Sequence, residues 1–313
     1  MKMIKAIKNG FFSGKGKFLC AALFYLAGAI FAYVGLAPLR HGLHKALDYV
    51  NGATHPALNG GLPALIEISM GDKSFWTMGI SLVGFALLVL LPVALFLTAG
   101  TYGLAAEAFE KPVRRFWGAA SSQFWPFAAL TIFNILYWVV LGIPAAFWFA
   151  GSRMIGQEHE TFVTSYRLFI INMVVLFVVV VLIRNVMNFT LAQYSVTPGR
   201  GVGRNFLHGL GFAWRRFFPV SFITVLFMGL RWATVWIFAV LLSAGFSSPG
   251  RWWLSAVLLQ IGWFIAAFLR VAEIRASVKY CGAFSWAEPP VEEKAPASPA
   301  HQVSVDDLSS TSL

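Results

Sequence analysis

One arginine, Arg231, lies about 14 residues into an apolar stretch that is long enough to cross a bilayer. At 1.5 Å per residue Arg231 is about 21 Å into that stretch, which is close to the middle of a bilayer. Insertion of an arginine at that depth costs a free energy of roughly 3 kcal/mol or more. We expect it to face the bundle interior or a wet cavity with Gln260 and Asn134 as partners, because no acidic residue stands at that depth. In the functional interpretation, Arg231 binds an anion or a lipid headgroup, or forms part of a gate. In the alternative interpretation, it has a structural role and forms hydrogen bonds with helix carbonyls and amides.

A second polar group stands where two apolar stretches end. Arg270 and Glu273 are three residues apart, a spacing that places them on one helix face as an ion pair. Arg184, Asn185 and Asn188 end an earlier apolar stretch. We expect these side chains to form a polar network on the cytoplasmic rim that binds a partner protein or a lipid headgroup. The alternative is ordinary snorkelling of polar side chains at the ends of spans.

A third set has the spacing of metal ligands. His41, His44 and Asp48 stand at positions i, i+3 and i+7, which share a helix face and could hold a zinc ion in the periplasm. His55 and His159 could add a ligand. The same segment, 39–50, has leucines at helical spacing on another face, which is typical of an amphipathic helix at a membrane surface. The alternative is therefore a solvated polar face without a metal.

Recognisable catalytic motifs are absent from the sequence. It has no nucleophile elbow, no Ser/His/Asp or Cys/His set and no zinc-protease motif. The basic, glycine-rich segments GKGK and PGRGVGR do not match phosphate-binding spacings. Cys20 and Cys281 are expected to be small apolar fillers. We therefore expect no cofactor, and an enzyme is the less favoured class.

Membrane-spanning helices must position these residues. Of 313 residues, 58% are hydrophobic and 12% charged, about half the charged fraction of a soluble domain. The mean hydropathy is +0.71. Six apolar stretches are long enough to cross a bilayer; they cover residues 18–36, 75–106, 124–150, 165–188, 219–245 and 252–280. The sequence predicts an all-α bundle of six transmembrane helices with short amphipathic helices at the interface.

The positive charges alternate between the loops. The net charge is +11, and most of the 24 Lys and Arg lie in the N-terminal segment, the second and fourth loops and the region after the last span. By the positive-inside rule we expect a bacterial inner-membrane protein with both termini in the cytoplasm. The pattern also indicates attraction of the protein to the anionic headgroups of the lipid bilayer, and it argues against nucleic acid as a partner.

The composition changes near the C-terminus. Residues 1–283 form the predicted six-span domain. Residues 284–313 are rich in Pro, Ser and acidic residues, which predicts a disordered cytoplasmic tail.

Two segments carry a resemblance to known proteins. They are TAGTYGLAAEAFEKPVRRFWGAASSQFWPF and RNVMNFTLAQYSVTPGRGVGRNFLHGLGFAWRRFF, in which a polar or glycine-rich span end leads into a basic, aromatic segment. They resemble a loose group of uncharacterised bacterial inner-membrane proteins, and the plan is similar to the membrane region of some glycerophosphodiester phosphodiesterases. The resemblance implies the architecture of most of residues 1–280. It implies no phosphodiesterase activity, since the soluble domain of those enzymes is absent, and no site residues.

Two classes of function remain open from the sequence. The first is a non-enzymatic membrane component, either a permease-like transport subunit or a scaffold for a membrane-protein partner or further copies of itself. The second is a lipid-acting enzyme that holds phosphate headgroups at the basic cytoplasmic rim. A water-accessible cavity at Arg231 favours transport, whereas a solid, dry bundle favours a scaffold.

Overall fold

The computed structural model describes residues 2–12, 16–48, 84, 86–106, 111–158, 162–198, 201–243 and 252–285. Over these ranges the chain is helical and contains no strand, which confirms the all-α prediction. In chain order the helices are α1 (Lys2–Phe12), α2 (Lys17–Asp48), the π-helical turn η1 (Ala86–Leu90), α6 (Leu91–Ala106), α7 (Pro112–Glu158), α8 (Phe162–Val196), α9 (Val202–Arg215), α10 (Phe217–Ser243) and α11 (Trp252–Ser285).

Several helices are long and apolar enough to cross a membrane. Within the described ranges five qualify, namely Leu88–Ala106, Pro112–Ser152, Tyr166–Val196, Phe217–Leu241 and Ala256–Phe284. A sixth candidate is the pair formed by α1 and Lys17–Tyr33 of α2, which are bent by 69° relative to each other. The chain therefore has five or six helices of membrane-spanning character, against the six expected. Most of the predicted tail lies outside the described residues, since α11 ends at Ser285.

Several helices are longer than the sequence predicts, most clearly α2 and α7. The structure continues α2 to Asp48, so the segment predicted as a separate amphipathic helix from residue 39 prolongs α2 as far as residue 48. Side chains from residue 34 onward in α2 lie outside the described part. Likewise α7 begins at Pro112, and the basic segment predicted as a loop forms its first turns. Proline is well suited to the first turn of a helix, where its missing N–H is not needed.

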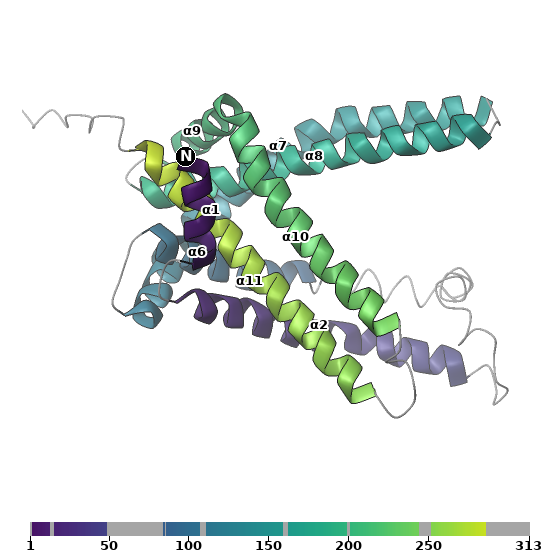
Figure 1. The fold of residues 1–313 in the computed structure, drawn as a ribbon, viewed down its shortest axis with the longest axis horizontal. Coiled ribbons are helices and arrows are strands. Elements are labelled where there is room, and N and C mark those ends of the chain that lie inside the picture. The colour runs from purple at the N-terminus through teal and green to yellow at the C-terminus, as the bar shows by residue number, and fades with distance from the viewer. Residues whose placement is uncertain are drawn as a thin grey trace, which may run out of the picture.

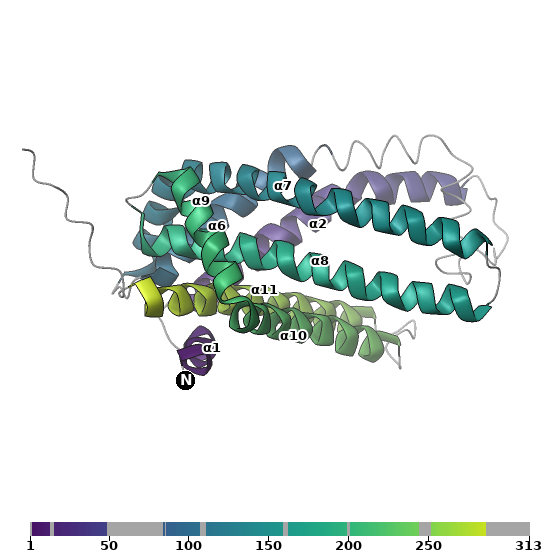
Figure 2. The same ribbon diagram turned by 90° about the horizontal axis from the view of Figure 1, so that it is seen from above.

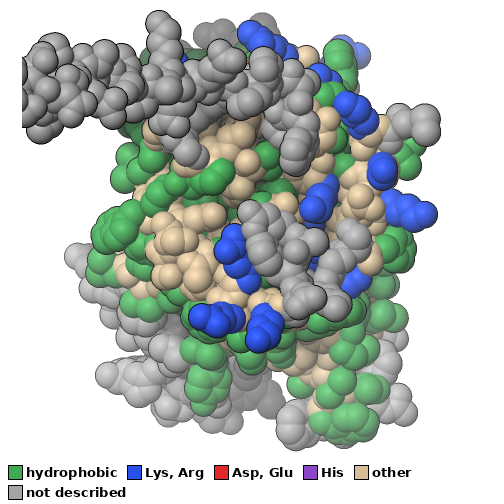
Figure 3. Space-filling view, turned by 90° about the vertical axis from the view of Figure 1, so that its left-hand side faces the viewer, with side chains coloured by type: hydrophobic (Ala, Val, Ile, Leu, Met, Phe, Trp, Pro, Cys, Tyr) green, Lys and Arg blue, Asp and Glu red, His purple; other side chains and the backbone are tan. Residues whose placement is uncertain are grey.

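The long helices run along the longest axis of the molecule, and both ends of the described chain lie at the same end of that axis (Figure 1; Figure 2). Lys2 Nζ donates a hydrogen bond to Ala283 O at 3.2 Å and lies 4.3 Å from the ring centroid of Phe284. Figure 3 shows this end of the molecule, where Lys and Arg side chains gather and no acidic side chain is visible among the coloured atoms. We call it the basic end.

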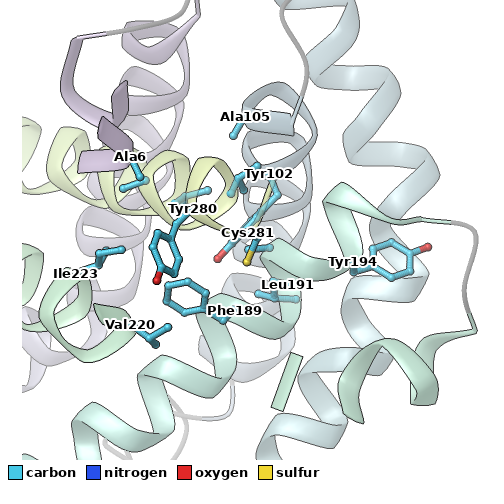
Figure 4. Close-up of a cluster of buried hydrophobic side chains, with 14 of the residues drawn as sticks. Ala6, Tyr102, Ala105, Phe189, Leu191, Tyr194, Val220, Ile223, Tyr280 and Cys281 are labelled. Carbon is cyan, nitrogen blue, oxygen red and sulfur yellow. The ribbon is translucent and has the colours of Figure 1, made fainter. Parts of the chain in front are cut away.

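The half of the bundle nearest the basic end is tightly packed. Aromatic and aliphatic side chains from α6, α7, α8, α10 and α11 form its core, including the fully buried Tyr102, Phe127, Phe189 and Ile223 (Figure 4). The short helices α1 and α9 pack against this core. α9 buries Asn205, Gly209 and Ala213, one position every four residues, and the partly buried Phe206, Leu210 and Phe212 pack against the core beside them. The packed half thus fixes the positions of α8, α10 and α11 relative to one another.

The other half of the bundle, the outer half, is open. Only 6% of an 18-residue apolar stretch of α8 is buried, against 50% for such a stretch of Leu88–Ala106. Over residues 166–180 of α8 and 229–241 of α10, nearly all side chains are exposed except one stripe at helical spacing. The α7–α8 hairpin accordingly diverges from α10, α11 and α2, as Figure 1 shows. We call these two groups of helices the upper arm (α7 and α8) and the lower arm (α2, α10 and α11).

Candidate functional site

A buried carboxylate lies where the packed half of the bundle meets the outer half. Glu273 of α11 is 0% exposed and is surrounded by three arginines. Arg184 of α8 donates through Nε to Oε1 at 2.9 Å and through Nη2 to Oε2 at 2.7 Å. Arg231 Nη2 of α10 and Arg270 Nη1 of α11 reach Oε2 at 3.0 and 3.1 Å. Three helices are thus joined through one carboxylate.

Asn188 completes this group. Its Nδ2 donates to Glu273 Oε1 at 2.8 Å, and its Oδ1 accepts from Arg270 Nη1 at 3.0 Å. The buried hydroxyl of Tyr102 on α6 donates to the backbone oxygen of Asn188 at 3.1 Å. A fourth helix therefore supports the site. We call Arg184, Asn188, Arg231, Arg270 and Glu273 the arginine cluster.

Helix geometry explains how the cluster forms. Arg184 and Asn188 are four residues apart on α8, and Arg270 and Glu273 are three apart on α11, so each pair shares one helix face. Arg231 follows the start of α10 by about 21 Å of helix, and Glu273 precedes Phe284 at the end of the last span by about 17 Å. Both measures place the cluster well inside the apolar helices.

The charges of the cluster do not balance. Three guanidinium groups around one carboxylate leave an excess of two positive charges. The side chains of Arg184, Arg231 and Arg270 are 23%, 20% and 20% exposed, whereas Glu273 is fully covered. In addition, Arg231 Nε is buried without a hydrogen-bond acceptor among the described residues. Uncompensated charge is costly away from water, so this arrangement is suited to receiving an anion.

The cluster contains most of the network that the sequence predicts. Arg184, Asn188, Arg270 and Glu273 are in direct contact, as the spacing of each pair indicates. Asn185 points elsewhere and donates through Nδ2 to Ser221 Oγ of α10 at 2.8 Å. The sequence predicts this network at the cytoplasmic rim of the membrane, and in the structure Glu273 precedes Phe284, the end of the last candidate span, by about 17 Å of helix.

The expected partners of Arg231 differ from those in the structure. Arg231 pairs with Glu273, while Gln260 Oε1 accepts from Tyr25 Oη at 2.6 Å. Asn134 donates to Leu130 O at 2.8 Å and to Thr190 Oγ1 at 3.2 Å. The physical reason is that a carboxylate binds a guanidinium more strongly than an amide does.

Polar side chains in the outer half form hydrogen bonds within each arm, and the sequence analysis did not predict them. In the upper arm Trp148 Nε1 donates to Asn172 Oδ1 at 3.1 Å, and Asn172 Nδ2 donates to Ser152 Oγ at 3.0 Å. In the lower arm Tyr25 and Gln260 join α2 to α11. Polar residues inside apolar stretches are the sequence signal for such bonds, but their pairing depends on helix register. Each arm is thus held together independently of the other.

The predicted zinc ligands lie outside the described side chains. His41, His44 and Asp48 belong to the part of α2 whose side chains are not described, and His55 and His159 lie in ranges that are not described at all. Elsewhere in the described ranges no group of three His, Cys, Asp or Glu residues has the arrangement of a metal site. Cys20 and Cys281 are both buried and unpaired, in agreement with a packing role.

No protein-family model, curated protein or solved structure matches this chain. Its function must therefore be argued from the arginine cluster and the helices around it.

Proposed function

We propose that this chain is a multi-pass protein of the bacterial cytoplasmic membrane with both termini in the cytoplasm. The apolar helices and the gathering of Lys and Arg at the basic end support this placement. Reporter fusions should then give cytoplasmic activity at both termini, and a periplasmic signal at either would contradict the orientation.

Within the membrane, the function that the geometry supports best is a permease-like component that binds an anionic group at the arginine cluster. The observation that carries this proposal is the excess of two positive charges deep in the apolar helices. Packing alone does not require such a cluster, because apolar residues of similar volume stabilise a protein as well as a buried ion pair does. A cluster that only held helices together would also be expected to be neutral, because an uncompensated buried charge destabilises the protein. The open outer half is also unlike the solid bundle that a scaffold would require.

Binding explains the cluster better than catalysis does. Glu273 accepts hydrogen bonds from Arg184, Asn188, Arg231 and Arg270, so neither of its oxygens is free to accept a proton from a substrate. The arginines are permanently charged and suit the recognition of phosphate or carboxylate. The cluster therefore has the groups of a binding site rather than those of a general acid or base.

Thermal unfolding in the presence of phosphate tests this function. For protein purified in an uncharged mild detergent, saturating phosphate should raise the apparent Tm by on the order of 5 °C relative to chloride at equal ionic strength. Arg231→Gln should largely abolish the shift because it removes one of the three charges. Arg114→Gln, an exposed arginine at the start of α7, is the matched control and should keep it. An equal shift in both variants, or none in the unaltered protein, would contradict the proposal.

A further inference from the structure

The surfaces that lead from the outer half to the arginine cluster are apolar. On α8, Val180 and Phe177 stand one and two turns outward from Arg184 on the same helix face. On α10, Val235 stands one turn outward from Arg231, and on α11 Trp263 stands two turns outward from Arg270. All four are substantially exposed, at 39%, 46%, 55% and 40% in that order.

These surfaces belong to different arms. Val180 and Phe177 lie on the upper arm, and Val235 and Trp263 lie on the lower arm, which diverges from it (Figure 1). The hydrogen bonds of Tyr25 with Gln260 and of Asn172 with Trp148 and Ser152 each lie within one arm, so none of these bonds joins the four surfaces across the divergence. A ligand that reaches the cluster from this side meets hydrocarbon first and cationic groups last.

This order of surfaces selects the chemical class of the ligand. A water-soluble anion would lose its hydration along Val180, Phe177 and Val235 without replacement, and that loss is costly. An amphiphile has the opposite preference, since its acyl chains gain from contact with these side chains while its headgroup reaches the arginines. The charge narrows the class further, because a phosphate monoester carries about −1.5 to −2 at pH 7 and a phosphodiester carries a single negative charge.

We propose that the arginine cluster binds the phosphate monoester of a lipid whose acyl chains lie between the two arms. This inference rests on the proposed function and specifies its ligand. The excess of two positive charges matches the headgroup, and the exposed apolar faces of α8, α10 and α11 accommodate the chains.

Native mass spectrometry of the full chain in mild detergent tests the proposal. Phosphatidic acid should be retained at one molecule per chain, about tenfold more strongly than phosphatidylglycerol or phosphatidylcholine. Glycerol 3-phosphate, which has the same headgroup without chains, should bind more weakly than phosphatidic acid. Arg231→Gln should lower the retention of phosphatidic acid about tenfold, and Arg114→Gln should leave it unchanged.

A pair of tryptophan substitutions separates the chain-binding surface from the headgroup site. Val180→Trp places a bulky side chain one turn from Arg184 on the exposed face of α8 and should lower phosphatidic acid retention while phosphate still raises the apparent Tm. Val139→Trp makes the same change at an exposed position of α7 and should have no effect on retention.

Four results would overturn the lipid ligand. If glycerol 3-phosphate binds as strongly as phosphatidic acid, the cluster is a site for soluble anions, and the proposed function stands while this inference fails. Retention of all three lipids to the same extent would show that the charge of the headgroup is not recognised. A spectrum dominated by lipid-free dimers would assign the apolar faces to a second copy of the chain. If neither phosphate nor any lipid binds, both the inference and the proposed function fail.

Discussion

Replacement of Glu273 by Gln is expected to destabilise the folded protein by about 3–5 kcal/mol, the largest effect of any single substitution considered. The carboxylate is fully buried and accepts hydrogen bonds from three arginines, so its removal leaves three positive charges without a counter-charge. The measurement is equilibrium unfolding in mild detergent and phosphate-free buffer, followed by helical circular dichroism.

A double substitution separates the effect of the lost negative charge from other effects of replacing Glu273. Glu273→Gln combined with Arg184→Gln removes one of the uncompensated charges and should be more stable than Glu273→Gln alone, a non-additive result that indicates direct coupling. Phosphate should also restore part of the stability of the single variant, since it supplies negative charge. Unchanged stability of Glu273→Gln in phosphate-free buffer would show that the carboxylate does not hold the cluster together.

The second large effect is expected at the contact between α6 and α7. A Cβ atom at Gly103 would overlap Ala119 Cβ, so the two helices approach closely only because residue 103 has no side chain. Gly103→Val should destabilise the protein by roughly 1–3 kcal/mol through overpacking. Because Tyr102 on the same helix supports Asn188, the variant should also weaken the phosphate-dependent rise in Tm.

Gly118→Val is the matched control for Gly103→Val. Gly118 lies in α7, and a Cβ atom there would meet nothing within 4 Å. Valine is a somewhat better helix former than glycine, so this variant should be as stable as the unaltered protein or slightly more stable. Thermal unfolding of the two variants side by side checks the prediction, and equal loss of stability in both would contradict the packing argument.

The helical architecture could be predicted from the sequence because apolar stretches of this length have few alternatives to a helix in a membrane. The ends of the helices could not, since composition marks where a stretch becomes polar rather than where the helix stops. α7 shows this clearly: Arg114 and Arg115 were expected in a loop, yet they lie in the first turns of the helix.

Pairs within one helix were also predictable, because the spacing of Arg270 and Glu273 fixes their shared face. The pairing of Arg231 with Glu273 was not, because it depends on the relative register of α10 and α11. The divergence of the two arms could not be predicted from the amino-acid composition of their helices either. Exposed side chains such as Phe177 and buried ones such as Phe189 are equally apolar, so only the structure separates them.

In the proposed function, a cationic cluster deep in the apolar helices holds an anion from the bilayer. The most direct test is an electron cryo-microscopy map of the protein in nanodiscs containing phosphatidic acid. We expect Arg184, Arg231 and Arg270 around Glu273, with headgroup density on their exposed side and chain density between α8 and α10. A map in which the two arms are packed against each other over a cluster with no added density would contradict this expectation.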